Sequence, residues 1–267
     1  MKDKDSGIWP CKNLVFGVGI SATTYDELLE SVIEAVKRKR PACISHLAVH
    51  GLVTSSQERE LRQILNEFDV VAPDGMPVRL ALNMLYGAQL PDRVYGPEFT
   101  LRVCERAAAD GIGVFLYGSY PQVVDDLRAN LLKRYPRLRI VGSEPSIFRP
   151  LTEAEDKDLV TRINESGAGV VFLGLGCPLQ ERFAYEHRAK IKAVQICVGA
   201  AFDFHSRNKK MAPAWIQRNS LEWLYRLVQE PRRLCGRYLV TNTIFLSKLI
   251  LQLSGLKKHK WPILDKR

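Results

Sequence analysis

An alternation of short apolar runs with amphipathic helical patterns, over residues 13–200, constrains the fold more than any other feature. It predicts strands at 14–18, 44–49, 69–72, 113–118, 139–143, 169–176 and 194–199. It predicts helices near 24–38, 57–66, 76–86, 98–109, 121–134, 152–165 and 178–190. Several strand runs are continuously apolar, as in parallel strands covered on both faces. We therefore expect an α/β fold, with a Rossmann-like, mostly parallel sheet and helices on both faces.

The chain changes character after the last predicted strand. Residues 207–267 show no strand alternation, are rich in Trp, Leu and Arg, and read as helices broken near Pro213 and Pro231. They carry fourteen Lys and Arg against three Asp and Glu, a net charge of +11, so residues 1–206 carry −1 of the total of +10. The predicted organisation is a disordered N-terminus at 1–12, an α/β catalytic domain at 13–206 and a basic, apolar helical appendage at 207–267.

Three features of the sequence indicate where in the cell the protein is found: its N-terminus, its longest apolar run and its cysteines. The charged N-terminus lacks the apolar stretch of a signal peptide. The apolar run at 243–256 is interrupted by Lys248 and is shorter than the ~20 residues that a membrane span needs. Six scattered cysteines form no C-x-x-C pair, which fits a reducing compartment without disulfides. We therefore expect a protein that is cytoplasmic or lies on a membrane without crossing it.

Small and polar residues follow the predicted strands, at the sheet edge where α/β proteins bind ligands. The candidates there are His50, Asp74, Gly118, Gly174, Gly176, Gly199 and Asp203. Glycine could simply close these turns, or it could let the backbone and helix N-termini approach a phosphate-bearing ligand. Because the glycines gather at one predicted edge, we favour the second interpretation.

Asp74 stands at a strand-to-helix corner. Its strand ends in Pro73-Asp74-Gly75, and Pro77 reads as the first turn of the next helix. The carboxylate can therefore cap that helix, or it can be placed there for chemistry.

Residues 174–181, GLGCPLQE, match the first two glycines of the dinucleotide-binding motif G-x-G-x-x-G. Leu179 replaces the third glycine, so the motif supports a dinucleotide site only weakly. Gln180 and Glu181 place an amide and a carboxylate in the first turn of the following helix, which is also simply a favourable helix start. Arg93, in PDRVYGPEF, could bind a phosphate with two hydrogen bonds or could be an ordinary surface residue.

No metal site is predicted. The two Asp-x-Asp strings, at 3–5 and 156–158, fall in the N-terminus and inside a predicted helix. The histidines at 46, 50 and 205 have no spacing typical of metal ligands.

Four arginines lie within three helical turns of the appendage, among aromatic residues and leucines: Arg226, Arg232, Arg233 and Arg237. A solvated basic face and nucleic-acid binding are alternatives. The stretch IFLSKLILQLSGL is largely apolar, which favours binding to an anionic membrane surface over binding to nucleic acid. We therefore expect no nucleic-acid partner.

Taken in order, these motifs resemble the WecG/TagA/CpsF family of glycosyltransferases from about residue 14 to 245. The matching stretches are VVAPDGMPV, DRVYGPEF, VFLYGS, LKRYPRLRIVG, VVFLGLGCPLQE, VGAAFDF and the appendage motif that contains EWLYR and EPRRL. The appendage motif is the most specific of them.

The resemblance implies an inverting transferase that moves a sugar from a UDP-sugar to a polyprenyl-diphosphate-linked acceptor, in exopolysaccharide or cell-wall polymer synthesis. It implies that Asp74 is the general base and that Arg93 and Gln180 contact substrate. It also implies that the appendage docks on the membrane and helps to close the site with its arginines. No metal or other cofactor is implied.

Two departures from the family pattern fall where specificity could be set. His46-Leu47-Ala48, followed by His50, replaces a Thr-x-Asn, and Glu98 replaces an aspartate. The donor sugar therefore stays open between N-acetylmannosamine, glucose and related sugars. A nucleotide- or NAD(P)-binding oxidoreductase is the alternative function, and a basic RNA-associated protein is a third. The apolar appendage could also be buried in a homo-oligomer.

Overall fold

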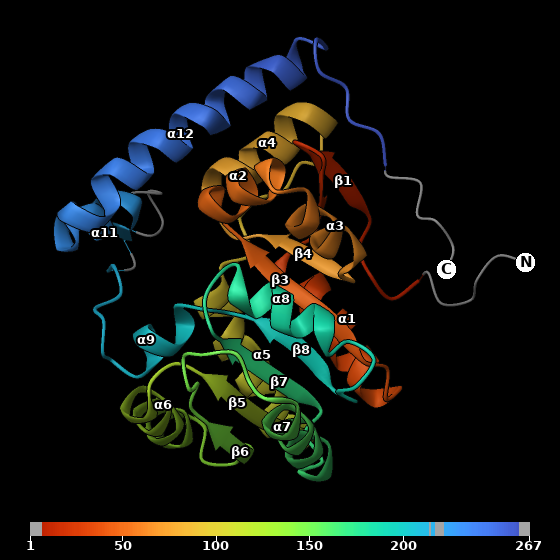
Figure 1. The fold of residues 1–267 in the computed structure, drawn as a ribbon, viewed down its shortest axis with the longest axis vertical. Coiled ribbons are helices and arrows are strands. Elements are labelled where there is room, and N and C mark those ends of the chain that lie inside the picture. Colours follow the sequence, from red (N-terminus) through yellow and green to blue (C-terminus); the bar gives the residue numbers. More distant parts are fainter. Residues whose placement is uncertain (1–6, 214, 217–221, 262–267) are drawn as a thin grey trace, which may run out of the picture.

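The computed structural model describes residues 7–213, 215–216 and 222–261, without the side chains of Arg226, Arg233 and Arg237. At its centre is a six-stranded sheet in the order β4-β3-β8-β7-β5-β6, and every pairing in it is parallel (Figure 1). Its strands are β3 (Ala42–Leu47), β4 (Val70–Pro73), β5 (Gly113–Gly118), β6 (Arg139–Glu144), β7 (Val170–Gly174) and β8 (Val194–Cys197). The predicted α/β fold class is confirmed.

Helices cover both faces of the sheet, because successive strand residues point to opposite faces. In β7, Val171 and Leu173 join one hydrophobic core, while Val170 and Phe172 join the other. The first core packs against α2 (Val49–Gln57), α3 (Arg59–Glu67), α4 (Met76–Tyr86), α7 (Glu153–Glu165) and α8 (Leu179–Glu186). The second packs against α1 (Tyr25–Lys37), α5 (Gly96–Asp110), α6 (Pro121–Arg134) and α9 (Ala201–His205).

The predicted strand at 14–18 is wrong. Residues there form an antiparallel hairpin of β1 (Lys12–Val15) and β2 (Val18–Ser21), in a sheet of its own. Phe16 and Gly17 turn the chain with φ angles of 56° and 85°. A two-residue hairpin turn with both φ angles positive matches the twist of the flanking strands. The sequence there is a continuous apolar run, and such a run gives no sign of a turn.

The sequence prediction also missed α2. The strand predicted at 44–49 ends at Leu47, and the single helix predicted at 57–66 is α3 alone. Ser55 and Ser56 hide α2 from a periodicity search, because they are buried although polar. Their hydroxyls donate to the carbonyls of Gly51 and Val53, both at 2.7 Å, so the helix satisfies them internally.

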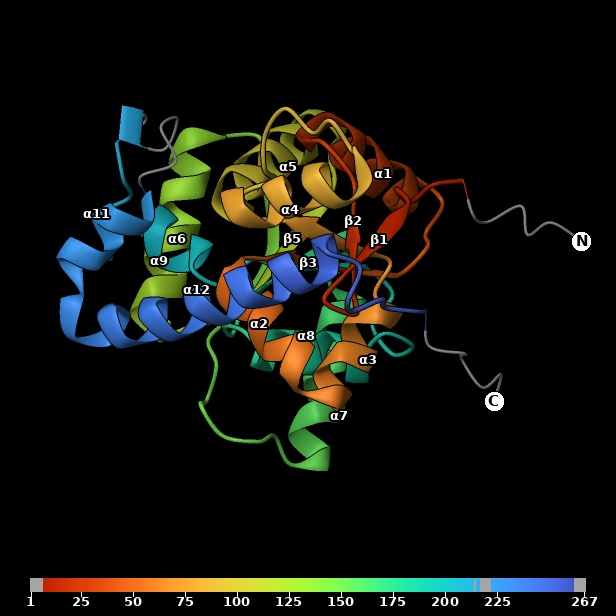
Figure 2. The same cartoon turned by 90° about the horizontal axis from the view of Figure 1, so that it is seen from above.

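The appendage consists of α11 (Glu222–Gln229) and α12 (Pro231–Leu253), and the predicted break at Pro231 is confirmed. Figures 1 and 2 show α12 running across α2 and α4. Phe245 packs edge-on against Phe16 with ring centroids 5.2 Å apart, and the Gln252 amide donates to the Leu14 carbonyl at 2.7 Å. The domain boundaries set out above stay predictions.

The length of α12 corrects the argument about membrane spans. Among the described residues, the segment Leu234–Leu253 is long and apolar enough to cross a membrane by length and composition. The apolar run at 243–256 looked too short because the helix continues on its N-terminal side. The contacts of Phe245 and Gln252 with the hairpin nevertheless hold the C-terminal half of α12 against the α/β part of the chain.

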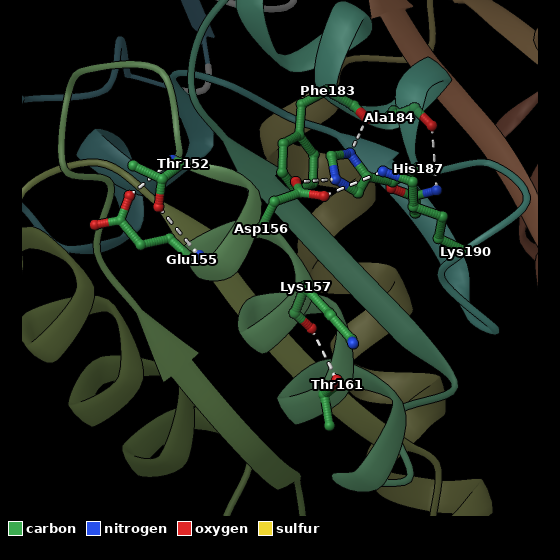
Figure 3. A network of polar contacts seen from close by, with 10 residues as sticks. Thr152, Glu155, Asp156, Lys157, Thr161, Phe183, Ala184, His187 and Lys190 are labelled. Carbon is green, nitrogen blue, oxygen red and sulfur yellow. Dashed lines mark hydrogen bonds and ion pairs between the residues drawn. The ribbon is translucent and has the colours of Figure 1, made fainter.

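A polar network joins α7 to the end of α8 (Figure 3). The ring of His187 lies 2.5 Å from Asp156 Oδ1 through Nε2 and 2.7 Å from the Phe183 carbonyl through Nδ1. Both partners offer acceptor oxygens, and the tautomer of the ring decides which nitrogen donates. Lys190 Nζ adds an ion pair to Asp156 at 3.1 Å. The aspartate of the second Asp-x-Asp string thus has a structural role.

We expect the stabilisation by Asp156 to disappear in acid. Burial raises the pKa of Asp156, but hydrogen bonds from His187 and Lys190 outweigh burial, so its pKa lies below the usual value. A lowered pKa stabilises the fold above the unfolded pKa of about 4 and ceases to do so as the pH falls through the folded value. Urea unfolding should show Asp156→Asn less stable than wild type at neutral pH, with the difference shrinking below about pH 4. Exposed Asp125→Asn is the control; a difference independent of pH would contradict the expectation.

Candidate active site

A cavity of about 390 Å³ lies between the carboxyl ends of β3 and β4 and the appendage. The α/β part of the chain contributes the predicted site residues His50, Asp74 and Arg93, together with Tyr95. The appendage contributes the other wall, with Glu222, Trp223, Tyr238, Thr241, Asn242, Phe245 and Leu246. His50 lies in the first turn of α2, not in a loop after a strand.

The Asp74 carboxylate is held by the start of α5. Its Oδ2 accepts a hydrogen bond from the Gly96 N–H at 3.0 Å, and Gly96 is the first residue of that helix. A Cβ on Gly96 would lie 3.3 Å from this oxygen, so glycine allows the close approach. The N-cap of α4 is Gly75, and the Asp74 carboxylate binds α5 instead. The positive end of the α5 dipole favours the ionised carboxylate.

Arg93 is fixed beside Asp74 by the appendage. Its Nη2 lies 2.5 Å from Glu222 Oε2, its guanidinium stacks 4.4 Å above the Tyr95 ring, and the Tyr95 hydroxyl donates to the other oxygen of Glu222. The Arg93 side chain is only 13% exposed and that of Glu222 only 7%. Burial lowers the pKa of Arg93, but Glu222 and Asp74 raise it more, so Arg93 stays a cation.

A second polar group lies beneath the sheet edge, at the start of α8. Glu181 Oε1 accepts hydrogen bonds from Ser45 Oγ and Gln180 Nε2, both at 2.9 Å. Gln180 and Glu181 are buried, and burial raises the pKa of Glu181 despite these hydrogen bonds. A Cβ on Gly199 would lie 3.3 Å from Gln180 Oε1, an atom with no hydrogen-bond partner among the described residues. The buried Oε1 of Gln180 is thus an acceptor without a hydrogen bond to a described residue, and it lies next to the Gly199 turn.

His46 links the two polar groups. It is buried in β3, its Nδ1 lies 3.3 Å from the Cys197 carbonyl, and Gly96 separates it from Asp74. Burial lowers the pKa of His46 to about 4, so the ring is neutral near pH 7. Its Nε2 is then an acceptor, and it has no partner in the described part of the chain.

Comparison of the sequence with known proteins identifies the family of this chain. The model of the glycosyl transferase WecG/TagA/CpsF family matches residues 13–259. The chain belongs to this family. It is similar to the N-acetylglucosaminyldiphosphoundecaprenol N-acetyl-β-D-mannosaminyltransferase of Bacillus subtilis (strain 168), at 29% identity over 218 residues, which is 81% of this chain and 82% of the relative. The resemblance read from the motifs is confirmed, and the chain is a glycosyltransferase.

Two glycines shape the sheet edge of this glycosyltransferase by close packing. A Cβ on Gly118 would lie 2.6 Å from the Gly174 carbonyl carbon, and one on Gly174 would lie 2.6 Å from the Phe202 ring. Gly118 also has a φ of 130°. Both glycines lie at the ends of β5 and β7 and neither lines the cavity around Asp74, whereas Gly176 adjoins Gly199 beside Gln180.

Other residues singled out from the sequence lie outside the cavity or outside the described part of the structure. Asp203 lies in α9, outside the cavity, and forms an ion pair with Lys209 at 3.1 Å. Glu98 is on an exposed face of α5, where it pairs with Arg102 at 3.2 Å, so the structure does not place this departure from the family pattern in the cavity. Arg232 is exposed. The side chains of Arg226, Arg233 and Arg237 fall outside the described part of the structure.

Sequence reasoning missed Glu222 and Tyr95 as members of the site. Glu222 begins the EWLYR motif, and that signal was available. The pairing of Glu222 with Arg93, 129 positions earlier, has no local signature. Within the described ranges no three His, Cys, Asp or Glu side chains gather as a candidate metal site.

Proposed function

We propose that this chain is an inverting glycosyltransferase that moves a sugar from a UDP-sugar to a polyprenyl-diphosphate-linked saccharide, in the synthesis of a bacterial surface polymer. The observation that carries the proposal is the cavity in which Asp74, fixed by the α5 N-terminus, adjoins the cation Arg93. The name of the Bacillus relative, a mannosaminyltransferase acting on a diphosphoundecaprenol-linked sugar, makes N-acetylmannosamine the first donor sugar to test.

In this mechanism Asp74 is the general base. It takes the proton from the acceptor hydroxyl while that oxygen attacks the anomeric carbon of the donor sugar. The bond from the anomeric carbon to the diphosphate oxygen breaks, and UDP leaves with the electron pair. A carboxylate held from the side by Gly96 has the fixed orientation that such a base needs.

Arg93 can neutralise the departing diphosphate. Glu222 engages its Nη2, and no hydrogen bond to a described residue occupies Nε or Nη1. Glu222 and the Tyr95 ring therefore hold the guanidinium in place and leave donors for phosphate oxygens. The pairing makes Glu222 a positioning residue.

Arg93→Lys should raise the KM for the donor by about tenfold or more, because lysine cannot bind Glu222 and a phosphate through one planar group and a charged hydrogen bond contributes about 1.5–3 kcal/mol. Steady-state kinetics with varied donor measures this. Arg102→Lys, on the exposed face of α5, is the matched control. An unchanged donor KM in Arg93→Lys would remove Arg93 from donor binding.

We also propose that transfer needs no metal ion, because Arg93 in the cavity can supply positive charge for the diphosphate. Full activity after dialysis against EDTA supports this. Activity lost to EDTA and restored by Mg²⁺ or Mn²⁺ contradicts it.

The appendage supports a peripheral location on the inner face of the membrane, where a lipid-linked acceptor would be found. Large apolar side chains of α12 are exposed, among them Leu239, Val240, Leu246 and Ile250. An anionic membrane surface could cover them, while a homo-oligomer is the alternative cover. Light scattering with and without vesicles distinguishes the two.

The test of the proposed function is transfer by the full chain. UDP-N-acetylmannosamine and UDP-glucose are offered with a lipid-diphosphate-linked N-acetylglucosamine, and product linkage is read by NMR. The expected product has an anomeric configuration opposite to that of the donor. Thermal shifts with UDP and with NAD(P) run alongside, because a ligand of the folded state raises its stability. Stabilisation by NAD(P) alone, without transfer, would favour the oxidoreductase.

A further inference from the structure

A second cavity, of about 440 Å³, lies where the end of α12 and the chain after it meet the catalytic domain. Three regions of the sequence line it: the β1–β2 turn, the end of α2 with α3, and Lys248 of α12 with residues 257–260. Its charged side chains are Arg59, Arg62, Lys248, Lys257 and Lys260, with His259 among them. Neither Asp nor Glu is among the described residues that line this basic pocket.

The five cations of the basic pocket have no carboxylate partner within the described part of the chain. None of them forms a salt bridge with a residue that the structure describes. Burial lowers the pKa of Lys248, and Lys257 and Arg62 lower it further by repulsion. Burial likewise lowers the pKa of His259, with repulsion from Lys257, Lys248 and Arg62 added. A bound anion would relieve this repulsion.

Packing and hydrogen bonds fix the walls of the pocket. A Cβ on Gly17 would lie 3.2 Å from His259 Nδ1 and 3.3 Å from Arg62 Cδ, so the three residues touch. The Asn66 side chain accepts from the Gly19 N–H at 2.7 Å and donates to the Gly17 carbonyl at 3.1 Å. The fold therefore fixes the walls that Gly17, Arg62, Asn66 and His259 form.

Exposed apolar side chains accompany the pocket. Ile250 is 64% exposed and Leu256 is 81% exposed, on either side of the end of α12, and Leu253 and Trp261 are also exposed. Figures 1 and 2 show the chain after α12 passing beside β1. Basic groups next to exposed apolar groups suit a ligand with a phosphate and hydrocarbon chains.

We propose that the basic pocket binds the phosphate of an anionic glycerophospholipid, while the apolar residues at the end of α12 contact its acyl chains. The site is separate from the transfer reaction, because no residue lines both cavities. A free phosphate ion shares the anionic chemistry but would leave Ile250 and Leu256 uncovered, so the lipid is the occupant that fits both features.

Vesicle flotation of the full chain tests the proposal. The vesicles are phosphatidylcholine alone and phosphatidylcholine mixed with phosphatidylglycerol. The pocket variant Arg59→Gln/Lys257→Gln is compared with the control Arg137→Gln/Lys258→Gln, which has the same net charge and exposed cations outside the pocket. We expect the pocket variant to bind the anionic vesicles about 25-fold more weakly than wild type, at about fivefold per basic residue, and the control to lose much less.

Equal losses of vesicle binding in the two variants would mean that the net charge of the protein attracts the membrane without a specific site, and would overturn the proposed lipid site. Wild-type stabilisation by inorganic phosphate, with the vesicle binding of the pocket variant intact, would make it a free-phosphate site and overturn the lipid assignment. Transfer to a short-chain, water-soluble acceptor is measured in parallel and should be equal in wild type and pocket variant. If no transfer occurs but the vesicle result holds, the proposed function fails and this site stands.

Discussion

Asp74→Asn should lower kcat for sugar transfer by about 10²–10⁴-fold while leaving the fold intact. The amide oxygen of Asn can still accept the hydrogen bond from Gly96, so the corner after β4 keeps its geometry. What disappears is the group that can take the acceptor proton. Transfer rates at saturating donor and acceptor, with thermal unfolding of the same preparation, measure both parts.

The control for Asp74 is Asp125→Asn, an exposed aspartate on α6 outside the cavity. It should retain the wild-type rate. Donor binding by Asp74→Asn, followed through its thermal shift, separates a chemical defect from a binding defect. A purified Asp74→Asn protein that transfers at an undiminished rate would end the assignment of Asp74 as the base.

Gly118→Ala should destabilise the protein by about 2–6 kcal/mol, because two penalties coincide. A φ of 130° is a backbone conformation that alanine rarely adopts, and strain of this kind costs about 1–3 kcal/mol. The new Cβ would also lie 2.6 Å from the backbone of Gly174, so β5 and β7 would have to separate, at a further cost of about 1–3 kcal/mol. Urea unfolding monitored by circular dichroism gives the difference.

Gly111→Ala is the matched control for Gly118. Gly111 follows α5 with a φ of 70°, and a Cβ there would meet no atom within 4 Å. Only the left-handed conformation counts against alanine, at about 1–2 kcal/mol. Equal destabilisation of the two variants would show that the contact with Gly174 relaxes freely and that only the φ angle matters.

Local signals in the sequence were sufficient for most of the framework. Continuous apolar runs predicted the parallel strands, Pro73-Asp74-Gly75 marked the corner that carries the catalytic candidate, and Pro231 marked the helix break. The motif order placed the chain in its family. These features depend on side-chain periodicity and turn chemistry within a few residues, and both are visible in one chain without its fold.

Tertiary structure decided the rest. The hairpin at Phe16-Gly17 looked like one strand, and α2 was hidden because its buried serines bond to their own helix. The ion pair of Arg93 with Glu222 and the basic pocket around Lys248 join segments far apart in the chain. Such pairings follow from how the appendage packs on the catalytic domain, and no pattern of neighbouring residues encodes that packing.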